Sequence, residues 1–123
     1  MHILLVEDVP SNQEVVIGLL ADTGIHIDVA DNGLQALEKL QAAPAKYQLI
    51  FMDMEMPQMD GISATKSIRN DAARYGTAPI IAMTANAFSE DVQNCLNAGM
   101  IDHISKPVEE KKILKMLVQY ASA

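Results

Sequence analysis

Several kinds of residue are scarce in this 123-residue sequence. Cys95 is the only cysteine, which excludes an intrachain disulfide and fits a reducing cytoplasm. Lys and Arg number 9 against 16 Asp and Glu, and the net charge of −7 disfavours binding to nucleic acid or to an anionic membrane surface. No apolar run approaches the roughly 20 residues of a membrane span, and no export leader precedes His2. We therefore expect a soluble, cytoplasmic protein.

Aromatic residues are also rare. They make up 4% of the chain, so Leu, Ile, Val, Met and Ala must fill the core. Half of the residues are hydrophobic, which is ample for one buried core. The length fits one domain of modal size, and no repeat or linker-like stretch divides it. We expect a single domain over residues 1–123.

Short apolar runs alternate with helical stripes along the whole chain. Strands are predicted at 2–7, which ends in acid as a buried strand does, and at 25–30, 48–53, 79–83 and about 102–105. Apolar stripes at helical spacing separate and follow them: Val15, Val16, Leu19, Leu20; Leu34, Leu37, Leu40; Ile62, Thr65, Ile68; Val92, Cys95, Leu96; Ile113, Leu114, Leu117, Val118.

Residues at the helix ends support this reading. Pro10 opens the first helix and Gly24 is expected to end it, as glycine does after a C-cap. Asp60 and Ser89 are expected to cap the third and fourth helices. The fifth helix follows Pro107.

Five strands alternating with five helices predict a doubly wound α/β domain with a parallel sheet. The strands are continuously apolar, as expected when helices cover both faces. In such sheets ligands bind beyond the carboxyl ends of the strands, so the chemistry should lie there.

Polar groups follow four of the predicted strands at their carboxyl ends. Glu7 and Asp8 follow the first strand, Asp53 ends the third, Thr84 follows the fourth and Lys106 follows the fifth. A lone aspartate there is usually a solvated loop residue. If the first and third strands are neighbours, however, three carboxylates converge and repel one another unless a cation joins them. Mg²⁺ suits such a site, because it takes one or two carboxylates together with water and phosphate oxygens.

A lysine in the same place suggests an anionic substrate, and the set therefore points to phosphoryl transfer. Lys106 and Mg²⁺ would neutralise the charge on the transferring group while a carboxylate attacks it. The Thr84 hydroxyl could then hydrogen-bond a phosphoryl oxygen. Spacing alone does not decide which carboxylate is the nucleophile.

Four segments carry a resemblance to a known family. The stretch Asp53-Met54-Glu55-Met56-Pro57-Gln58-Met59-Asp60-Gly61 resembles the phosphoacceptor loop of response-regulator receiver domains. The segments 4–8 (Leu-Leu-Val-Glu-Asp), 82–85 (Ala-Met-Thr-Ala) and 105–107 (Ser-Lys-Pro) continue the match in order and spacing. The resemblance covers essentially the whole chain. It implies the flavodoxin-like, chemotaxis-regulator-like strand order 2-1-3-4-5.

The resemblance also implies roles for individual residues. Asp53 would accept phosphate from a phosphohistidine on a histidine kinase or histidine phosphotransfer protein. Asp8 and Asp53 would bind Mg²⁺ (or Mn²⁺) together with the Glu55 backbone carbonyl, and Glu7 would assist through water. Lys106 would contact the phosphoryl group and the carboxylate.

Signal output is implied as well. Thr84 would move toward the phosphate and alter the face formed by the helix before Gly99, the strand 102–105 and the helix after Pro107. A downstream effector would read this face, and a weak homodimer is possible. The Lys106–Pro107 bond is typically cis in this family. No independent turnover beyond the domain's own phosphorylation and dephosphorylation is expected.

One position departs from the family pattern. His103 stands where receivers usually have Tyr or Phe as the rotating partner of the switch threonine. It is either an imidazole that changes rotamer with Thr84 or a partly exposed histidine with no part in signalling. Glu55 and Asn86 occupy positions that tune dephosphorylation in the family.

Some alternatives stay open. Segments 84–88 and 98–107 look most like receivers attached to hybrid sensor histidine kinases, so the chain is a piece of such a kinase or a stand-alone regulator. A Mg²⁺-dependent phosphatase or a Toprim-like enzyme also uses strand-end acids, although Glu55 departs from the phosphatase pattern. A pseudo-receiver would lack Asp53, Asp8 or Lys106, and all three are present.

Overall fold

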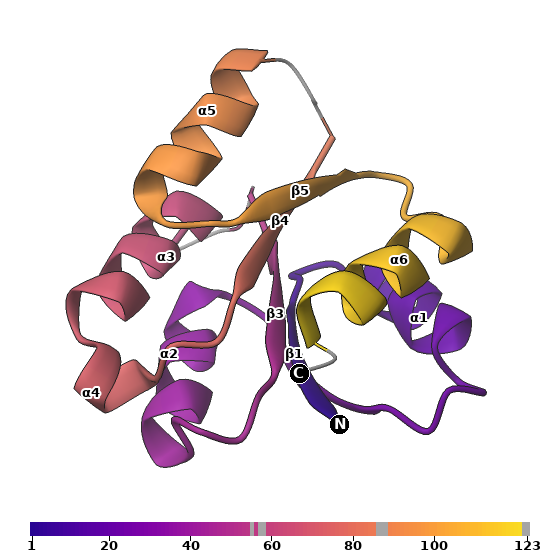
Figure 1. Ribbon diagram of the computed structural model, residues 1–123, viewed down its shortest axis with the longest axis horizontal. Coiled ribbons are helices and arrows are strands. Elements are labelled where there is room, and N and C mark those ends of the chain that lie inside the picture. The colour runs from indigo at the N-terminus through magenta and orange to yellow at the C-terminus, as the bar shows by residue number, and fades with distance from the viewer. Residues whose placement is uncertain (55, 57–58, 86–88, 122–123) are drawn as a thin grey trace.

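The computed structural model describes residues 1–54, 56, 59–85 and 89–121. Within these ranges one sheet of five parallel strands runs through the molecule (Figure 1). The strand order is β2-β1-β3-β4-β5, which confirms the predicted doubly wound topology. The strands are β1 (His2–Val6), β2 (His26–Ala30), β3 (Leu49–Asp53), β4 (Ile80–Thr84) and β5 (Asp102–Ser105).

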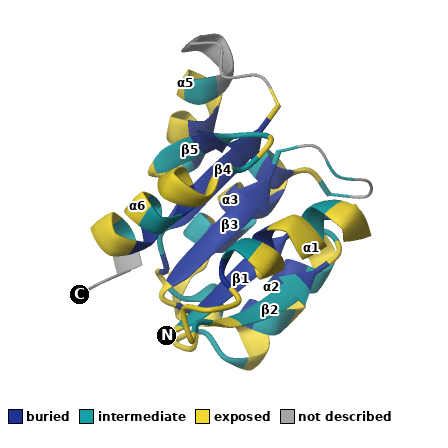
Figure 2. Ribbon diagram, turned by 90° about the vertical axis from the view of Figure 1, so that its right-hand side faces the viewer, coloured by how far each residue is buried: buried dark blue, intermediate teal, exposed yellow. Residues whose placement is uncertain are grey.

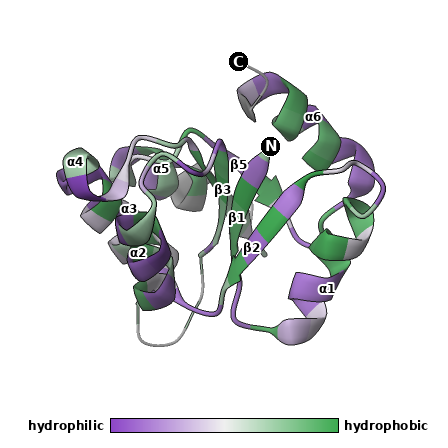
Figure 3. Cartoon of the chain, turned by 90° about the horizontal axis from the view of Figure 1, so that it is seen from below, coloured by the Kyte–Doolittle hydropathy of each residue, from purple (hydrophilic) through white to green (hydrophobic). Residues whose placement is uncertain are grey.

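Helices cover both faces of the sheet. Figure 3 shows α1 and α6 on one side, and α2, α3, α4 and α5 on the other. The helices are α1 (Pro10–Leu19), α2 (Gly33–Ala42), α3 (Gly61–Asn70), α4 (Ala72–Tyr75), α5 (Ser89–Ala98) and α6 (Glu110–Ala121). Five of them are the predicted helices. The single turn α4 was not predicted; the side chain of Asp71 caps it by accepting from the Arg74 N–H.

The strands alternate their side chains between two apolar clusters. Leu4 and Val6 of β1 pack in the cluster beneath α2 and α3, whereas Ile3 and Leu5 pack in the cluster beneath α1 and α6. Every residue of β3 and β4 is buried, as the dark blue strands of Figure 2 show. Burial on both faces explains the continuous apolar runs of β1, β3 and β4. The outer strands β2 and β5 are largely half-buried and carry polar residues, so the prediction of continuously apolar strands was wrong for these two.

The predicted apolar stripes are wider than the helix faces that reach the core. Four of their members are between 43% and 70% exposed: Val15, Leu34, Leu96 and Val118. Each lies about 100° around its helix from an adjacent residue that packs inward, because an α-helix turns once in about 3.6 residues. The apolar stripes therefore extend beyond the helix faces that are buried.

The helix ends agree with the sequence at some positions and differ at others. The Asp60 carboxylate accepts from the Ser63 N–H at 2.8 Å, which confirms the predicted cap. Gly99 follows α5 with φ of +115°. Gly24 has a positive φ, but α1 ends at Leu19, so its predicted place directly after the helix was wrong. The capping role predicted for the Ser89 side chain lies outside what the structure describes.

Candidate functional site

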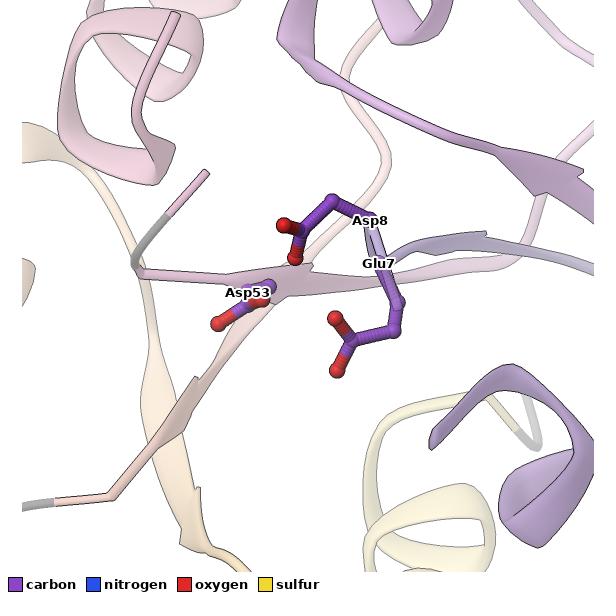
Figure 4. Close-up of side chains that lie close together, drawn as sticks. All are labelled: Glu7, Asp8 and Asp53. Carbon is purple, nitrogen blue, oxygen red and sulfur yellow. The ribbon is translucent and has the colours of Figure 1, made fainter. Parts of the chain in front are cut away.

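Three carboxylates meet at the carboxyl edge of the sheet. Val6 of β1 lies opposite Met52 of β3, so the residues that follow leave the sheet side by side. Glu7, Asp8 and Asp53 each offer an oxygen within 4.8 Å of the others (Figure 4). Glu7 is 1% exposed and Asp53 3% exposed, while Asp8 is half-buried. The convergence predicted from neighbouring strands is confirmed.

Lys106 brings a positive charge to these acids. Its Nζ lies 2.7 Å from Glu7 Oε1 and 3.0 Å from Asp53 Oδ1. Its own N–H donates to the carbonyl of Thr84 at 2.9 Å, which fixes the lysine beside the end of β4. The Lys106–Pro107 peptide bond is cis, as the resemblance to receiver domains implied.

Lys106 and Glu7 shift each other's pKa toward the charged forms. Burial alone would raise the pKa of Glu7, but hydrogen bonds with Lys106 and Asp53 outweigh it and lower that pKa. Burial alone would lower the pKa of Lys106, but hydrogen bonds with Glu7 and Asp53 raise it. One ammonium group faces three carboxyl groups, so the site retains an excess of negative charge that suits a divalent cation.

The acids differ in their access to solvent. A hollow at this edge is lined by Asp8, Asp53 and Lys106 together with Val9, Met54 and Ala85. Glu7 does not line it. Its carboxylate instead accepts from Lys106 Nζ and, through Oε2, from the Val9 N–H at 3.2 Å. A ligand in this hollow would therefore face Asp8 and Asp53. Glu7 would act on it indirectly, through its contact with the Lys106 ammonium.

Thr84 and His103, the predicted switch residues, lie on neighbouring strands. Thr84 is buried at the end of β4 and lies opposite Ser105 in the register. His103 lies opposite Ala82, its side chain is 33% exposed, and its Nδ1 is 3.7 Å from Asp102 Oδ1. The positions predicted to tune dephosphorylation, Glu55 and Asn86, lie outside the described residues, and so does the predicted Glu55 carbonyl ligand.

Sequence reasoning missed one residue that supports the acids. The Gln13 side-chain amide donates to the Glu7 carbonyl at 2.6 Å and to Asp31 Oδ1 at 2.8 Å. A glutamine in the first turn of a helix carries no signal of this contact in a single sequence. Cys95 is buried and its Sγ lies 3.4 Å from the Met54 Sδ, in keeping with the apolar role expected of it.

Fold and site together define a class of protein. It is a doubly wound α/β domain whose acidic cluster and lysine lie at the point between β1 and β3 where the strand order reverses. Residues 3–118 match the family model described as "Response regulator receiver domain". The chain belongs to the response regulator receiver family and is thus a phosphoacceptor domain of two-component signalling. This agrees with the receiver interpretation of the sequence rather than with the phosphatase or Toprim alternatives.

Two curated relatives are histidine kinases. The signal transduction histidine-protein kinase BarA of Escherichia coli K12 is 38% identical over 120 residues, which cover 98% of this chain and 13% of the kinase. The osmosensing histidine protein kinase SLN1 of Saccharomyces cerevisiae is 39% identical over 127 residues, which cover 100% of this chain and 10% of the kinase. The chain thus spans about a tenth of the length of these relatives.

Solved receiver domains share the fold closely. The receiver domain of the sensor histidine kinase PA1611 from Pseudomonas aeruginosa PAO1 is 38% identical with a TM-score of 0.87, and the match covers 99% of this chain and 98% of that one. That domain was solved with a magnesium ion coordinated in its active site cleft. The Saccharomyces cerevisiae receiver of Ssk1, solved with the phosphotransfer protein Ypd1, is 29% identical with a TM-score of 0.88, covering 98% and 88% of the two chains.

Proposed function

We propose that Asp53 accepts a phosphoryl group from a phosphohistidine of a histidine kinase or histidine phosphotransfer protein. One observation carries this assignment: Asp53 both lines the open hollow and contacts the Lys106 ammonium at 3.0 Å. Glu7 contacts the lysine but does not line the hollow, and Asp8 lines the hollow without a described contact to the lysine. Asp53 is thus the acid best placed for attack on a donor arriving from solvent.

The proposed transfer is a single displacement. A carboxylate oxygen of Asp53 forms a bond to phosphorus while the bond from phosphorus to the donor imidazole breaks, and the electron pair of that bond returns to the imidazole nitrogen. The product is an aspartyl phosphate. Lys106 stabilises the charge on the transferring group because its ammonium already lies within hydrogen-bonding distance of the accepting carboxylate.

We propose that Asp8 and Asp53 hold Mg²⁺, with Glu7 contributing through water. Two carboxylates facing an open hollow fit the ligand set of this ion, or of Mn²⁺, which keeps several waters and phosphate oxygens. When bound, the ion neutralises negative charge on the phosphoryl oxygens. The Glu55 carbonyl is retained as a further ligand by analogy with the family.

We propose that Thr84 and Lys106 carry the signal to the face formed by α5, β5 and α6. Phosphorylation adds roughly 1.5 to 2 negative charges at Asp53, which would attract the Thr84 hydroxyl. The Thr84 carbonyl accepts from the Lys106 N–H, so movement at the end of β4 reaches the end of β5 directly. His103 is proposed as the second member of this switch, with Glu55 and Asn86 setting the phosphate lifetime.

The wider setting is also proposed from the relatives. The chain would serve as the receiver of a hybrid histidine kinase or as a stand-alone regulator in the cytoplasm. Its partners would be a phosphohistidine donor and an effector that reads the α5–β5–α6 face, with weak self-association possible. Among the described residues no helix is long and apolar enough to cross a membrane.

A small phosphodonor tests the assignment without knowledge of the cognate partner. The protein is incubated with acetyl phosphate and Mg²⁺, and intact mass spectrometry counts added phosphates. We expect one phosphate on the wild type and none on Asp53→Ala or after chelation of Mg²⁺. Asp22→Ala, an exposed acid in the turn before β2, is the matched control and should be labelled normally. Labelling of Asp53→Ala at the wild-type level would contradict the proposal.

A further inference from the structure

The side chain of Gln13 joins the ends of β1 and β2 directly behind the acidic cluster. Its amide group donates one hydrogen bond to the Glu7 carbonyl oxygen at 2.6 Å and one to Asp31 Oδ1 at 2.8 Å. Both hydrogens of the amide are thus donated, and each acceptor belongs to the residue directly after a strand of the sheet. The contact links α1, the end of β1 and the loop that follows β2.

The two acceptors are themselves held in place. The Glu7 N–H donates to the Ala30 carbonyl at 3.0 Å, so the Glu7 backbone is fixed at both its polar groups. The Asp31 N–H donates to Gln35 Oε1 at 2.9 Å, which ties the loop to α2. Gln13 therefore bonds to an anchored strand end on one side and to an anchored loop on the other.

The Glu7 carbonyl belongs to the peptide unit that leads into Asp8. Because a peptide unit is planar, holding this oxygen sets the direction in which the chain enters Asp8 and thus where the Asp8 carboxylate points. The other hydrogen bonds described at Val9 leave the Glu7 carbonyl unconstrained: the Val9 N–H donates to Glu7 Oε2, and the Val9 carbonyl accepts from the N–H groups of Asn12 and Gln13. In the described part of the chain, Gln13 is the side chain recorded on that oxygen.

We propose that Gln13 is a positioning residue for Asp8, and that it sets the affinity of the acidic site for Mg²⁺ and thereby the rate of phosphorylation at low Mg²⁺. The inference rests on the proposed function of Asp8 and Asp53. Gln13 itself does not line the hollow, and its amide donates to the Glu7 carbonyl and to Asp31 rather than to Asp8 or Asp53.

A role of Gln13 in holding the fold together can be distinguished from a role in positioning Asp8. Gln13 is half-buried, and α1 packs on the sheet through other residues, among them Val16 and Leu20 after its end. Replacing the amide by an apolar group of the same length keeps the helix packing but removes both donated hydrogen bonds. The two roles therefore predict different results for Mg²⁺ affinity and for folding.

The test compares Gln13→Met with Gln13→Arg in the full 123-residue chain. Mg²⁺ affinity is measured by NMR titration in the absence of a phosphodonor, and stability by urea unfolding in EDTA. For Gln13→Met we expect the Kd for Mg²⁺ to rise about tenfold and the urea midpoint in EDTA to fall modestly, because the Glu7 carbonyl and Asp31 lose their donor. For Gln13→Arg, whose guanidinium still donates to both acceptors, we expect a Kd within about twofold of the wild type.

Kinetics give a second readout. With acetyl phosphate, Gln13→Met should label slowly at low Mg²⁺ and approach the wild-type rate at saturating Mg²⁺. Gln93→Met is the matched control, because the Gln93 amide bonds only to Asn97 among the described contacts on α5. Asp31→Ala removes the second acceptor and should raise the Kd for Mg²⁺ severalfold while Gln13 is retained.

Defined results would overturn the inference. A Kd of Gln13→Met within about twofold of the wild type would do so, because the lost hydrogen bond would then have no effect at the site. Equal weakening in Gln13→Arg and Gln13→Met would also do so. If instead Asp53→Ala is still phosphorylated, the proposed function fails, but a shifted Kd in Gln13→Met would still place Gln13 behind the cation site.

Discussion

The peptide N–H of Lys106 donates a 2.9 Å hydrogen bond to the carbonyl oxygen of Thr84. The backbone of the lysine that follows β5 is therefore joined to the last residue of β4. The ammonium end of the same lysine contacts the carboxylates of Glu7 and Asp53. One residue, through its backbone and its side chain, thus links the strand end that carries the buried Thr84 hydroxyl to the acidic cluster.

Replacing this lysine should destabilise the fold. In Lys106→Ala the Glu7 carboxylate, which is 1% exposed, loses its cationic partner. We expect the free energy of unfolding to fall by about 1–3 kcal/mol, the cost of an unsatisfied buried acceptor. Urea unfolding in EDTA measures the loss. Lys112→Ala, an exposed lysine on α6, should change stability by less than about 0.5 kcal/mol.

Addition of Mg²⁺ should restore part of that loss, since a cation in the hollow supplies positive charge beside the uncompensated acids. A Lys106→Ala protein as stable as the wild type in EDTA would show that the contact between Lys106 and Glu7 contributes nothing to the fold.

The signal should depend on the same lysine. We predict that Lys106→Ala still accepts phosphate on Asp53 but no longer changes the surface of α5, β5 and α6. The amide NMR spectrum before and after addition of acetyl phosphate and Mg²⁺ measures that change. Wild-type shifts of the amides of this face in phosphorylated Lys106→Ala would remove Lys106 from the switch.

Low pH should weaken the contacts that Asp28, on the edge strand β2, makes with Lys46 and Tyr47. The Asp28 carboxylate pairs with Lys46 Nζ at 2.8 Å and accepts from the Tyr47 hydroxyl at 2.7 Å. The hydrogen bond from Lys46, followed by the one from Tyr47, lowers the pKa of Asp28. Because this pKa is lower in the folded than in the unfolded chain, the stabilisation is present above the unfolded pKa of about 4 and is lost as the pH falls through the folded value.

We therefore expect Asp28→Asn to be less stable than the wild type at neutral pH by about 1 kcal/mol, a value discounted for the partial exposure of both partners. The difference should disappear well below pH about 4. Urea unfolding at the two pH values checks this, with Asp22→Asn as the exposed control. A difference that persists in acid would mean that the charge of Asp28 is not its cause.

Two glycines should respond to alanine in opposite directions. Gly99 has φ of +115°, and a Cβ there would lie 2.6 Å from Arg69 Cγ. Arg69 cannot move freely, because its guanidinium donates to the carbonyls of Gly99 and Ala78 at 3.0 and 3.1 Å. Gly99→Ala should therefore destabilise the protein by about 1–3 kcal/mol.

Gly18 lies inside α1, and a Cβ there would meet nothing within 4 Å. Gly18→Ala should stabilise the protein by about 0.5–1 kcal/mol, since alanine restricts the unfolded chain and favours the helix. The Tm of each variant, measured by thermal unfolding beside the wild type, tests both predictions. Equal changes for the two would contradict this account of the backbone at Gly99.

The sheet and the place of the site could be predicted from the sequence because both depend on local patterns. A buried parallel strand must be apolar throughout, and its first polar residue then marks the strand's carboxyl end. Glu7, Asp53 and Thr84 were found in this way, whereas Lys106 follows a strand that is mostly polar. That β1 and β3 are neighbours, which brings the acids together, was implied by the resemblance to receiver domains and not by local patterns.

Contacts that depend on side-chain direction could not be predicted. The bond from Lys106 to Glu7 joins residues at opposite ends of the chain, and the bridge from Gln13 to Asp31 joins helix α1 to the loop after β2. The exposure of Val118 depends on how far α6 is rotated against the sheet, which its periodicity alone does not fix. His2 and His26 stack with ring centroids 4.8 Å apart because β1 and β2 pair in that register.

The central claim is that Asp53, and no other acid of the cluster, carries the phosphoryl group. Borohydride reduction tests it most directly, because it converts an aspartyl phosphate to homoserine at the modified position. After treatment with acetyl phosphate and Mg²⁺, peptide mass spectrometry should find homoserine at position 53. Homoserine at position 8, or reduction at position 7 in place of Asp53, would contradict the account.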